Sequence, residues 1–283
     1  MTKKQKGILF ILISAFCFSL MNMFVKLSGD LPSMQKSFFR NLVALLVAAI
    51  MLRQSHLPFR WQKGNLGLLI VRASFGTLGI LCNFYAISNM NLADASMLNK
   101  LSPFFVILFS YLFLKEKVTP TQALCVITAF IGSMFIIKPG FAFGSPLPAI
   151  AGFIGGLGAG AAYTAVRALS LKGEKGPFIV FFFSAFSCLV TLPALLFHYT
   201  PMTGKQLLFL LLAGICASGG QFGITAAYAN APGREISIYD YTIVIFAGIW
   251  SFLLWGDLPD ILSIAGYVII FGASLFMFLY NRK

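Results

Sequence analysis

The sequence has few charged residues for its length. Only 10% of its 283 residues are Asp, Glu, Lys or Arg, whereas 59% are hydrophobic. A soluble domain has about 25% charged residues, and a chain this poor in charge could not cover a water-exposed surface. The composition therefore excludes a soluble globule, a disordered chain and a collagen-like repeat, and it indicates an integral membrane protein.

Residues and motifs typical of enzymes are also scarce. The chain has eight acidic residues and two histidines, and both histidines, His56 and His198, lie at the edges of apolar segments. The sequence contains no H-E-x-x-H, Walker A or G-x-S-x-G motif. Its five cysteines lie inside apolar segments without a C-x-x-C pair, which argues against disulfides and metal sites. We therefore expect no enzyme, no ATP-driven pump and no cofactor.

Long apolar runs account for most of the chain. A membrane-spanning helix needs about 20 mostly apolar residues, and the runs lack the two-residue alternation of a membrane β-barrel. The fold class predicted is all-α integral membrane with ten transmembrane helices, joined by loops too short to form a soluble domain. The predicted spans are Gly7–Lys26, Ser33–Leu52, Leu66–Ser88, Asp94–Leu114, Gln122–Ile137, Ala149–Leu169, Phe178–Phe197, Gln206–Ala229, Ile236–Trp255 and Ile261–Tyr280.

Basic residues are distributed unequally between the loops. If the N-terminus is cytoplasmic, fourteen Lys and Arg fall on the cytoplasmic side and only Lys26, Lys36, Lys138 and Lys205 on the outer side. Such an excess is typical of cytoplasmic loops. We therefore predict a multi-pass protein of the cytoplasmic membrane with both termini in the cytoplasm. The net charge of +13 is interpreted as a topology signal and not as a nucleic-acid-binding surface.

The two halves of the chain resemble each other at an offset of 141 residues. Polar residues coincide as well as apolar ones, in the pairs Lys26/Arg167, Asn89/Asn230, Asp94/Glu235, Ser96/Ser237 and Glu116/Asp257. Each half contains five spans, so the second copy must enter the membrane from the opposite face. The predicted domains are two inverted five-helix repeats, residues 1–141 and 142–283. Alternating-access carriers are built in this way.

A family resemblance rests on the ends of these repeats. They read LADASMLNKLSPFFVILFSYLFLKEKVTPTQALCVITAFIGSMFI from Leu92 and SIYDYTIVIFAGIWSFLLWGDLP from Ser237. Over essentially its whole length the chain resembles the drug/metabolite transporter superfamily, of the EamA type with ten helices. It departs from that pattern at Asp257, where such proteins often have Glu, and at Lys115, where a small residue is common. The resemblance implies secondary transport of small organic metabolites, either into or out of the cell.

Four charged residues fall deep inside predicted spans, where each needs a partner, a cavity or a route to the interface. Arg40 and Arg72 are interpreted first as snorkelling or interhelical structural residues. Lys100 and Asp240 are more informative, because the 141-residue offset makes Asn99 the counterpart of Asp240. Regular helices would place Ser96, Asn99, Pro103 and Ser110 on one face of the fourth span and Ser237, Asp240, Val244 and Ser251 on one face of the ninth.

These polar faces predict a substrate cavity between the repeats. The residues predicted to bind substrate are Asn22, Asn99, Lys100, Tyr163, Gln221, Thr225 and Asp240. One acid and one base suit a small polar or zwitterionic metabolite. Asp240 is the candidate for proton coupling because burial favours an uncharged carboxyl group. The alternative at this site is a structural Lys100–Asp240 ion pair that only holds the halves together.

The leading functional prediction is a secondary carrier that works by alternating access, proton-coupled or as an exchanger. The alternatives are a channel, an accessory subunit of an assembly or, with less support, a lipid-modifying enzyme. The expected partners are a small-molecule substrate and the lipid bilayer, without nucleic acid, and the protein is expected to be a monomer or a homodimer.

Overall fold

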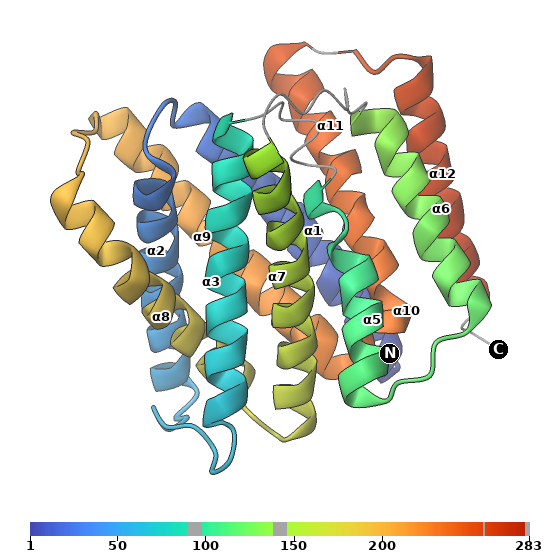
Figure 1. Cartoon of the computed structure of the whole chain (residues 1–283), viewed down its shortest axis with the longest axis horizontal. Coiled ribbons are helices and arrows are strands. Elements are labelled where there is room, and N and C mark those ends of the chain that lie inside the picture. Colours follow the sequence, from blue (N-terminus) through green and yellow to red (C-terminus); the bar gives the residue numbers. More distant parts are fainter. Residues whose placement is uncertain (90–97, 138–145, 257, 281–283) are drawn as a thin grey trace.

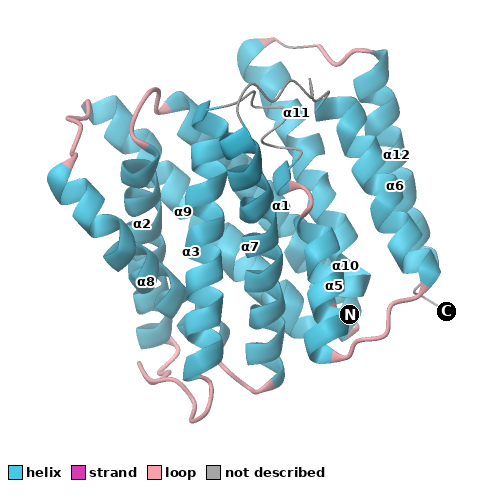
Figure 2. Cartoon of the chain, in the orientation of Figure 1, coloured by secondary structure: helices cyan, strands magenta, loops and turns pink. Residues whose placement is uncertain are grey.

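The structure is a bundle of long helices (Figure 1). This computed structural model describes residues 1–89, 98–137, 146–256 and 258–280. Within these residues there are helices and loops but no β-strand (Figure 2). The helices are α1 (Lys3–Leu27), α2 (Ser33–Gln54), α3 (Leu66–Asn89), α5 (Ser102–Leu114), α6 (Pro120–Ile137), α7 (Pro146–Leu171), α8 (Gly176–Phe197), α9 (Gly204–Asn230), α10 (Gly233–Ile236), the 3₁₀ helix η1 (Ser237–Tyr241), α11 (Thr242–Trp255) and α12 (Ile261–Tyr280).

The described helices confirm the all-α membrane fold. Nine helical segments are long and apolar enough to cross a bilayer, and α5 is a shorter apolar helix that makes the tenth crossing. In this count α10, η1 and α11 form one continuous segment, Gly233–Leu254. The predicted fourth span begins at Asp94, but residues 90–97, which include Asp94 and Ser96, lie outside the described residues.

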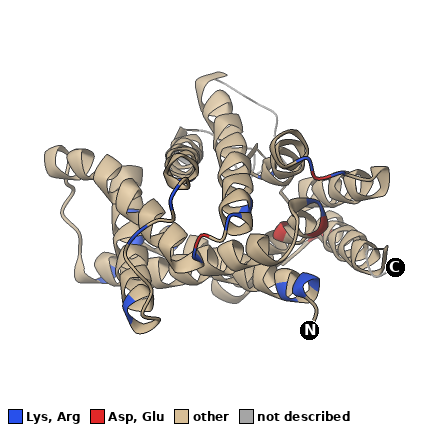
Figure 3. Ribbon diagram, turned by 90° about the horizontal axis from the view of Figure 1, so that it is seen from below, with Lys and Arg blue, Asp and Glu red and all other residues tan. Residues whose placement is uncertain are grey.

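Ten crossings bring the beginning of α1 and the end of α12 to the same face of the bundle (Figure 1). We call this the terminal face and the other one the opposite face. The loops α2–α3, α5–α6 and α7–α8 lie at the terminal face and carry six of the twelve described basic residues that were assigned to the cytoplasm (Figure 3). Lys138, Arg282 and Lys283 lie outside the described residues. That the terminal face is cytoplasmic stays a prediction.

Packing between the helices follows the duplication. The closest helix pairs are α1 with α9, α3 with α7, α2 with α8 and α6 with α12. Exchanging the repeats converts the first pair into the second and leaves the third and fourth unchanged. The chain is therefore built from two inverted five-helix repeats. The exact domain boundary, predicted between residues 141 and 142, falls among residues 138–145, outside the described part.

Small residues let these helices approach closely. A Cβ atom added at Gly156 of α7 would lie 2.6 Å from the carbonyl oxygen of Leu98, and one at Gly79 of α3 would lie 3.2 Å from the carbonyl oxygen of Gly155. At the repeat-related contact of α1 with α9, a Cβ at Gly223 would lie 3.0 Å from Cβ of Ser14. Glycines spaced four residues apart thus serve helix packing, as is common in membranes.

Two repeat-equivalent positions end helices in the same way. Lys115 follows α5 with φ of 55°, and Gly256 follows α11 with φ of 71°. The two residues are 141 positions apart. This left-handed conformation suits glycine, so a glycine at position 115 would fit the backbone better than the lysine present. Lys115 itself is exposed, which leaves its long side chain room at the terminal face.

Candidate substrate cavity between the repeats

The site begins where two membrane crossings are interrupted. In the first repeat, Leu98 and Asn99 are helical, the chain turns at Lys100 and Leu101, and α5 then begins at Ser102 with Pro103 in its first turn. Proline is favoured there because it lacks the N–H that the first turn cannot use. In the second repeat, the 3₁₀ helix η1 replaces α-helix between α10 and α11. Both interruptions lie at the same place in the duplicated sequence.

The regular α-helix predicted for the ninth span is therefore wrong at Ser237–Tyr241. A 3₁₀ helix has three residues per turn, so residues three apart eclipse one another. Ser237 and Asp240 still lie on one side of the segment, but the predicted continuation of that face to Val244 and Ser251 crosses from η1 into α11. Ser251 does interact with another residue of the chain.

The two interruptions contact each other directly. Lys100 Nζ and Asp240 Oδ2 form an ion pair of 3.2 Å, and the Tyr241 hydroxyl donates a hydrogen bond of 3.0 Å to the carbonyl oxygen of Lys100. Lys100 and Tyr241 are themselves repeat equivalents, 141 residues apart. The Lys100–Asp240 pair predicted as the structural alternative is thus formed, and it joins the repeats.

A cavity of about 140 Å³ lies around this contact. Its lining comes from both repeats, and its basic and acidic members are Arg40, Arg72, Lys100 and Asp240. Six of the seven predicted site residues line it, namely Asn22, Asn99, Lys100, Tyr163, Gln221 and Asp240. The structure therefore brings these six side chains together, and their role in substrate binding stays a prediction.

Thr225 is the predicted site residue that lies elsewhere. It is 1% exposed, and its methyl group lies 3.5 Å from the position of a Cβ at Gly176, at the start of α8. The described residues that line the central cavity do not include it; it lines an apolar groove along α1, α8 and α9 instead. Four residues advance an α-helix by about 6 Å and rotate it by about 40°, which is enough to move Thr225 away from Gln221 and the cavity.

Arg40 and Arg72 line the cavity, although the sequence favoured a role as snorkelling or interhelical structural residues. They are only 3% and 2% exposed, so neither snorkels to the interface. Arg40 Nε donates to the sulfur of Met21 at 3.0 Å, and Arg72 Nη2 donates to Oε1 of Gln221 at 2.9 Å. The Arg72 guanidinium also lies 4.0 Å from the ring centroid of Phe183. The interhelical part of the earlier interpretation is correct, and the snorkelling part is wrong.

Two stacked tyrosines, Tyr163 and Tyr228, lie at the cavity. Tyr163 of α7 lines the cavity and stacks on Tyr228 of α9, with ring centroids 5.6 Å apart. Tyr163 lines this cavity together with Arg40, Arg72 and Asp240. Its place one helical turn before Arg167 connects the cavity with a group of charges at the terminal face.

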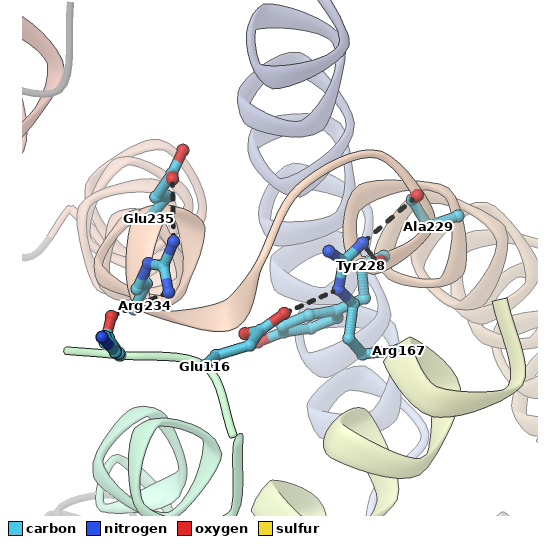
Figure 4. Close-up of polar contacts among 7 residues, drawn as sticks. Glu116, Arg167, Tyr228, Ala229, Arg234 and Glu235 are labelled. Carbon is cyan, nitrogen blue, oxygen red and sulfur yellow. Dashed lines mark hydrogen bonds and ion pairs between the residues drawn. The ribbon is translucent and has the colours of Figure 1, made fainter. Parts of the chain in front are cut away.

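That group of charges joins the repeats (Figure 4). Arg167 Nε pairs with Glu116 Oε1 at 3.1 Å, and Arg167 Nη1 donates to the carbonyl oxygen of Tyr228 at 3.1 Å. Glu116 follows α5 in the first repeat, whereas Arg167 and Tyr228 belong to the second. We call the Glu116–Arg167 ion pair the terminal latch. A second contact, from Arg234 Nη1 to the carbonyl oxygen of Lys117 at 2.7 Å, also crosses between the repeats.

Residues 5–138 and, again, residues 147–279 match the EamA-like transporter family. The chain belongs to this family. The double match agrees with the two repeats of the structure. This EamA-like transporter therefore acts on a small molecule in a lipid bilayer and is not an enzyme, and its membership confirms the resemblance to drug/metabolite transporters.

Several relatives cover nearly the whole EamA-like chain. The pseudopaline exporter CntI of Pseudomonas aeruginosa is 34% identical over 96% of this chain and 95% of that protein. Solute carrier family 35 member G1 of Homo sapiens is 28% identical over 95% of this chain and 78% of that protein. A riboflavin transporter of Brucella anthropi is 27% identical over 87% and 88%. One solved crystal structure shares the fold, with a TM-score of 0.89 over 99% of this chain and 98% of its own, at 12% identity.

Proposed function

We propose that this transporter is a secondary active carrier that binds a small polar organic metabolite in the central cavity and exposes it to each side of the membrane in turn. The observation that carries the proposal is the charged cavity at the crossing of two interrupted helices, lined by both repeats. Substrate sites of carriers with inverted repeats lie at this kind of crossing. Rocking one repeat against the other would open the cavity to one face while closing it to the other.

The terminal latch supports this mechanism. It joins the repeats across the terminal face in the present conformation. The 141-residue offset gives Glu116 and Arg167 the equivalents Asp257 and Lys26, and Lys26 lies in the last turn of α1, at the opposite face. Asp257 lies outside the described residues, so the opposite latch is part of the proposal. Alternate closing of equivalent latches at the two faces would give the carrier two states of similar free energy.

The names of relatives support an organic substrate without selecting one. The relatives are named for pseudopaline and for riboflavin, and one of them is named as an exporter. We therefore propose transport of an organic metabolite across the cytoplasmic membrane by a monomer or a homodimer. The direction of transport and the substrate itself do not follow from these names.

Asp240 is proposed as the coupling residue. It lines the cavity, is 9% exposed and pairs with Lys100, so protonation of its carboxyl group would release Lys100. A proton bound in one state and released in the other would tie transport to the proton gradient. Exchange of one metabolite for another needs no such step and is the alternative mode.

The test is countertransport in proteoliposomes with a metabolite mixture inside and labelled candidates outside. For a carrier, uptake of the labelled compound is saturable, and unlabelled substrate inside the proteoliposomes accelerates it. Flux proportional to concentration, without that acceleration, would identify the channel alternative. A lack of flux together with a stable partner protein would identify the accessory subunit.

A variant tests the coupling role of Asp240. Asp240→Asn is expected to transport without pH dependence, and normal pH dependence in this variant would reject the coupling role.

A further inference from the structure

The central cavity carries an excess of positive charge. Among its described lining residues, three are basic, namely Arg40, Arg72 and Lys100, and one is acidic, Asp240. Lys100 and Asp240 neutralise each other in their 3.2 Å ion pair. Three positive charges and one negative charge leave a net excess of two, and this excess resides on the two arginines.

The contacts of the two arginines do not neutralise them. Arg40 donates to a thioether sulfur, which is a weak acceptor. Arg72 donates to an uncharged amide and lies over an aromatic ring. No ion pair to either arginine is found among the described residues. The two guanidinium groups also carry the same charge into one cavity, so neither compensates the other.

Each arginine also has one buried nitrogen with unused hydrogen-bond capacity. Arg40 Nη1 and Arg72 Nε are buried, and within the described part of the chain neither has a hydrogen-bond partner. Buried charges that lack a counter-charge are costly, and so are buried donors without an acceptor. An anionic ligand that reached both groups would remove both costs, since carboxylates and phosphates accept hydrogen bonds from guanidinium groups in pairs.

We propose that the substrate is an organic anion with at least two negatively charged groups, held by Arg40 from α2 and Arg72 from α3. This inference rests on the proposed function, because it assigns a substrate class to the same cavity. Gln221 is a positioning residue here, since its Oε1 accepts a hydrogen bond from Arg72. This anion replaces the zwitterion as the proposed substrate, because Lys100 and Asp240, from which the zwitterion was predicted, are already paired with each other.

Binding of charge-matched probes to the purified full-length protein tests this inference. Succinate, γ-aminobutyrate and putrescine share a four-carbon chain and are respectively doubly anionic, zwitterionic and doubly cationic near neutral pH. We expect succinate, and the triply anionic tricarballylate, to raise the apparent melting temperature in a saturable way at constant ionic strength. γ-Aminobutyrate and putrescine are expected to leave it unchanged.

Variants connect the effect to the cavity. Arg40→Gln and Arg72→Gln are each expected to weaken succinate binding about tenfold or more. Arg40→Lys and Arg72→Lys keep the charge and serve if a Gln variant fails to fold. Arg60→Gln is the matched control, because Arg60 is an exposed arginine in the α2–α3 loop, and it is expected to bind succinate like the unchanged protein.

Three results would overturn the inference: no stabilisation by the anions, equal stabilisation by all three four-carbon probes, or equal succinate binding by the unchanged protein and the arginine variants. Failure of the proposed function has a different signature. Succinate binding through Arg40 and Arg72 without any countertransport would support the anion site and contradict the carrier mechanism. Saturable countertransport of only a cation or a zwitterion would support the carrier mechanism and contradict the anion site.

Discussion

At the scale of single residues, the Lys100–Asp240 pair has a structural cost that can be measured. Removing one partner of a buried ion pair costs about 3–5 kcal/mol, because the other charge is left without compensation. We expect Asp240→Asn to lower the free energy of unfolding by about that much, measured by thermal or denaturant unfolding in detergent. The double variant Asp240→Asn with Lys100→Met is expected to recover most of the loss. A double variant less stable than Asp240→Asn would contradict the pairing.

The position of Arg72 depends on a glycine one turn further along α3. A Cβ atom at Gly76 would collide with Nη1 of Arg72 and lie 2.9 Å from Cε2 of Phe183. Gly76→Ala is therefore expected to displace the guanidinium from the cavity and to weaken anion binding and transport about tenfold. Gly67→Ala is the matched control in α3, because a Cβ there meets no atom within 4 Å. Equal transport rates for the two variants would show that Arg72 tolerates displacement.

The sequence predicted most of the site residues that line the cavity, but it did not predict the excess of positive charge there. Asn99 and Asp240 could be found because the 141-residue offset relates them, and Gln221 because it is a polar residue in an apolar helix. The roles of Arg40 and Arg72 could not be found in this way, because their depth depends on the tilt of α2 and α3 and on which neighbours cover them. The balance of acidic and basic residues within the spans could have indicated this excess, because Asp240 alone cannot neutralise Arg40, Arg72 and Lys100.

At the scale of helices, the spans followed from composition, whereas the interruption in the ninth crossing did not. Pro103 marks the break in the fourth crossing. Ser237–Tyr241 contains no proline or glycine, and its 3₁₀ geometry depends on contacts with the first repeat, such as the hydrogen bond from Tyr241 to Lys100. Tertiary contacts of this kind are not visible in a local sequence pattern.

The terminal latch supports a prediction about access to the cavity. Arg167→Gln removes the ion pair to Glu116 and weakens the bond to the carbonyl of Tyr228, so the terminal face should open more often. We expect a cysteine at position 162, which lines the cavity, to react several-fold faster with a thiol reagent applied from the terminal face. The background would lack the five native cysteines.

Lys172→Gln is the control for this experiment. Lys172 is exposed just after α7 and lies on the same face as the latch. If Lys172→Gln accelerates labelling as much as Arg167→Gln does, general loss of positive charge explains the result and the latch does not. Unchanged labelling in Arg167→Gln would show that other contacts hold the terminal face closed.

At the scale of the whole molecule, the duplication predicted the arrangement of helices. An odd number of spans in each repeat requires inversion, and the pairs α1·α9 and α3·α7 follow from that symmetry. The terminal latch did not follow, because its ion pair joins residues of different repeats, and their approach depends on how α5 packs against α7.

The most direct test of the proposed carrier mechanism measures both faces in one experiment. Spin labels at Lys117 and Leu171 report the terminal face, and labels at Leu258 and Asp30 occupy the repeat-equivalent positions, 141 residues away, at the opposite face. Pulsed electron paramagnetic resonance gives the distance distribution for each pair, with and without Arg167→Gln. We expect the variant to add a longer distance at the terminal face and a shorter one at the opposite face. A change at the terminal face with none at the opposite face, or changes of the same sign at both, would contradict alternating access by two inverted repeats.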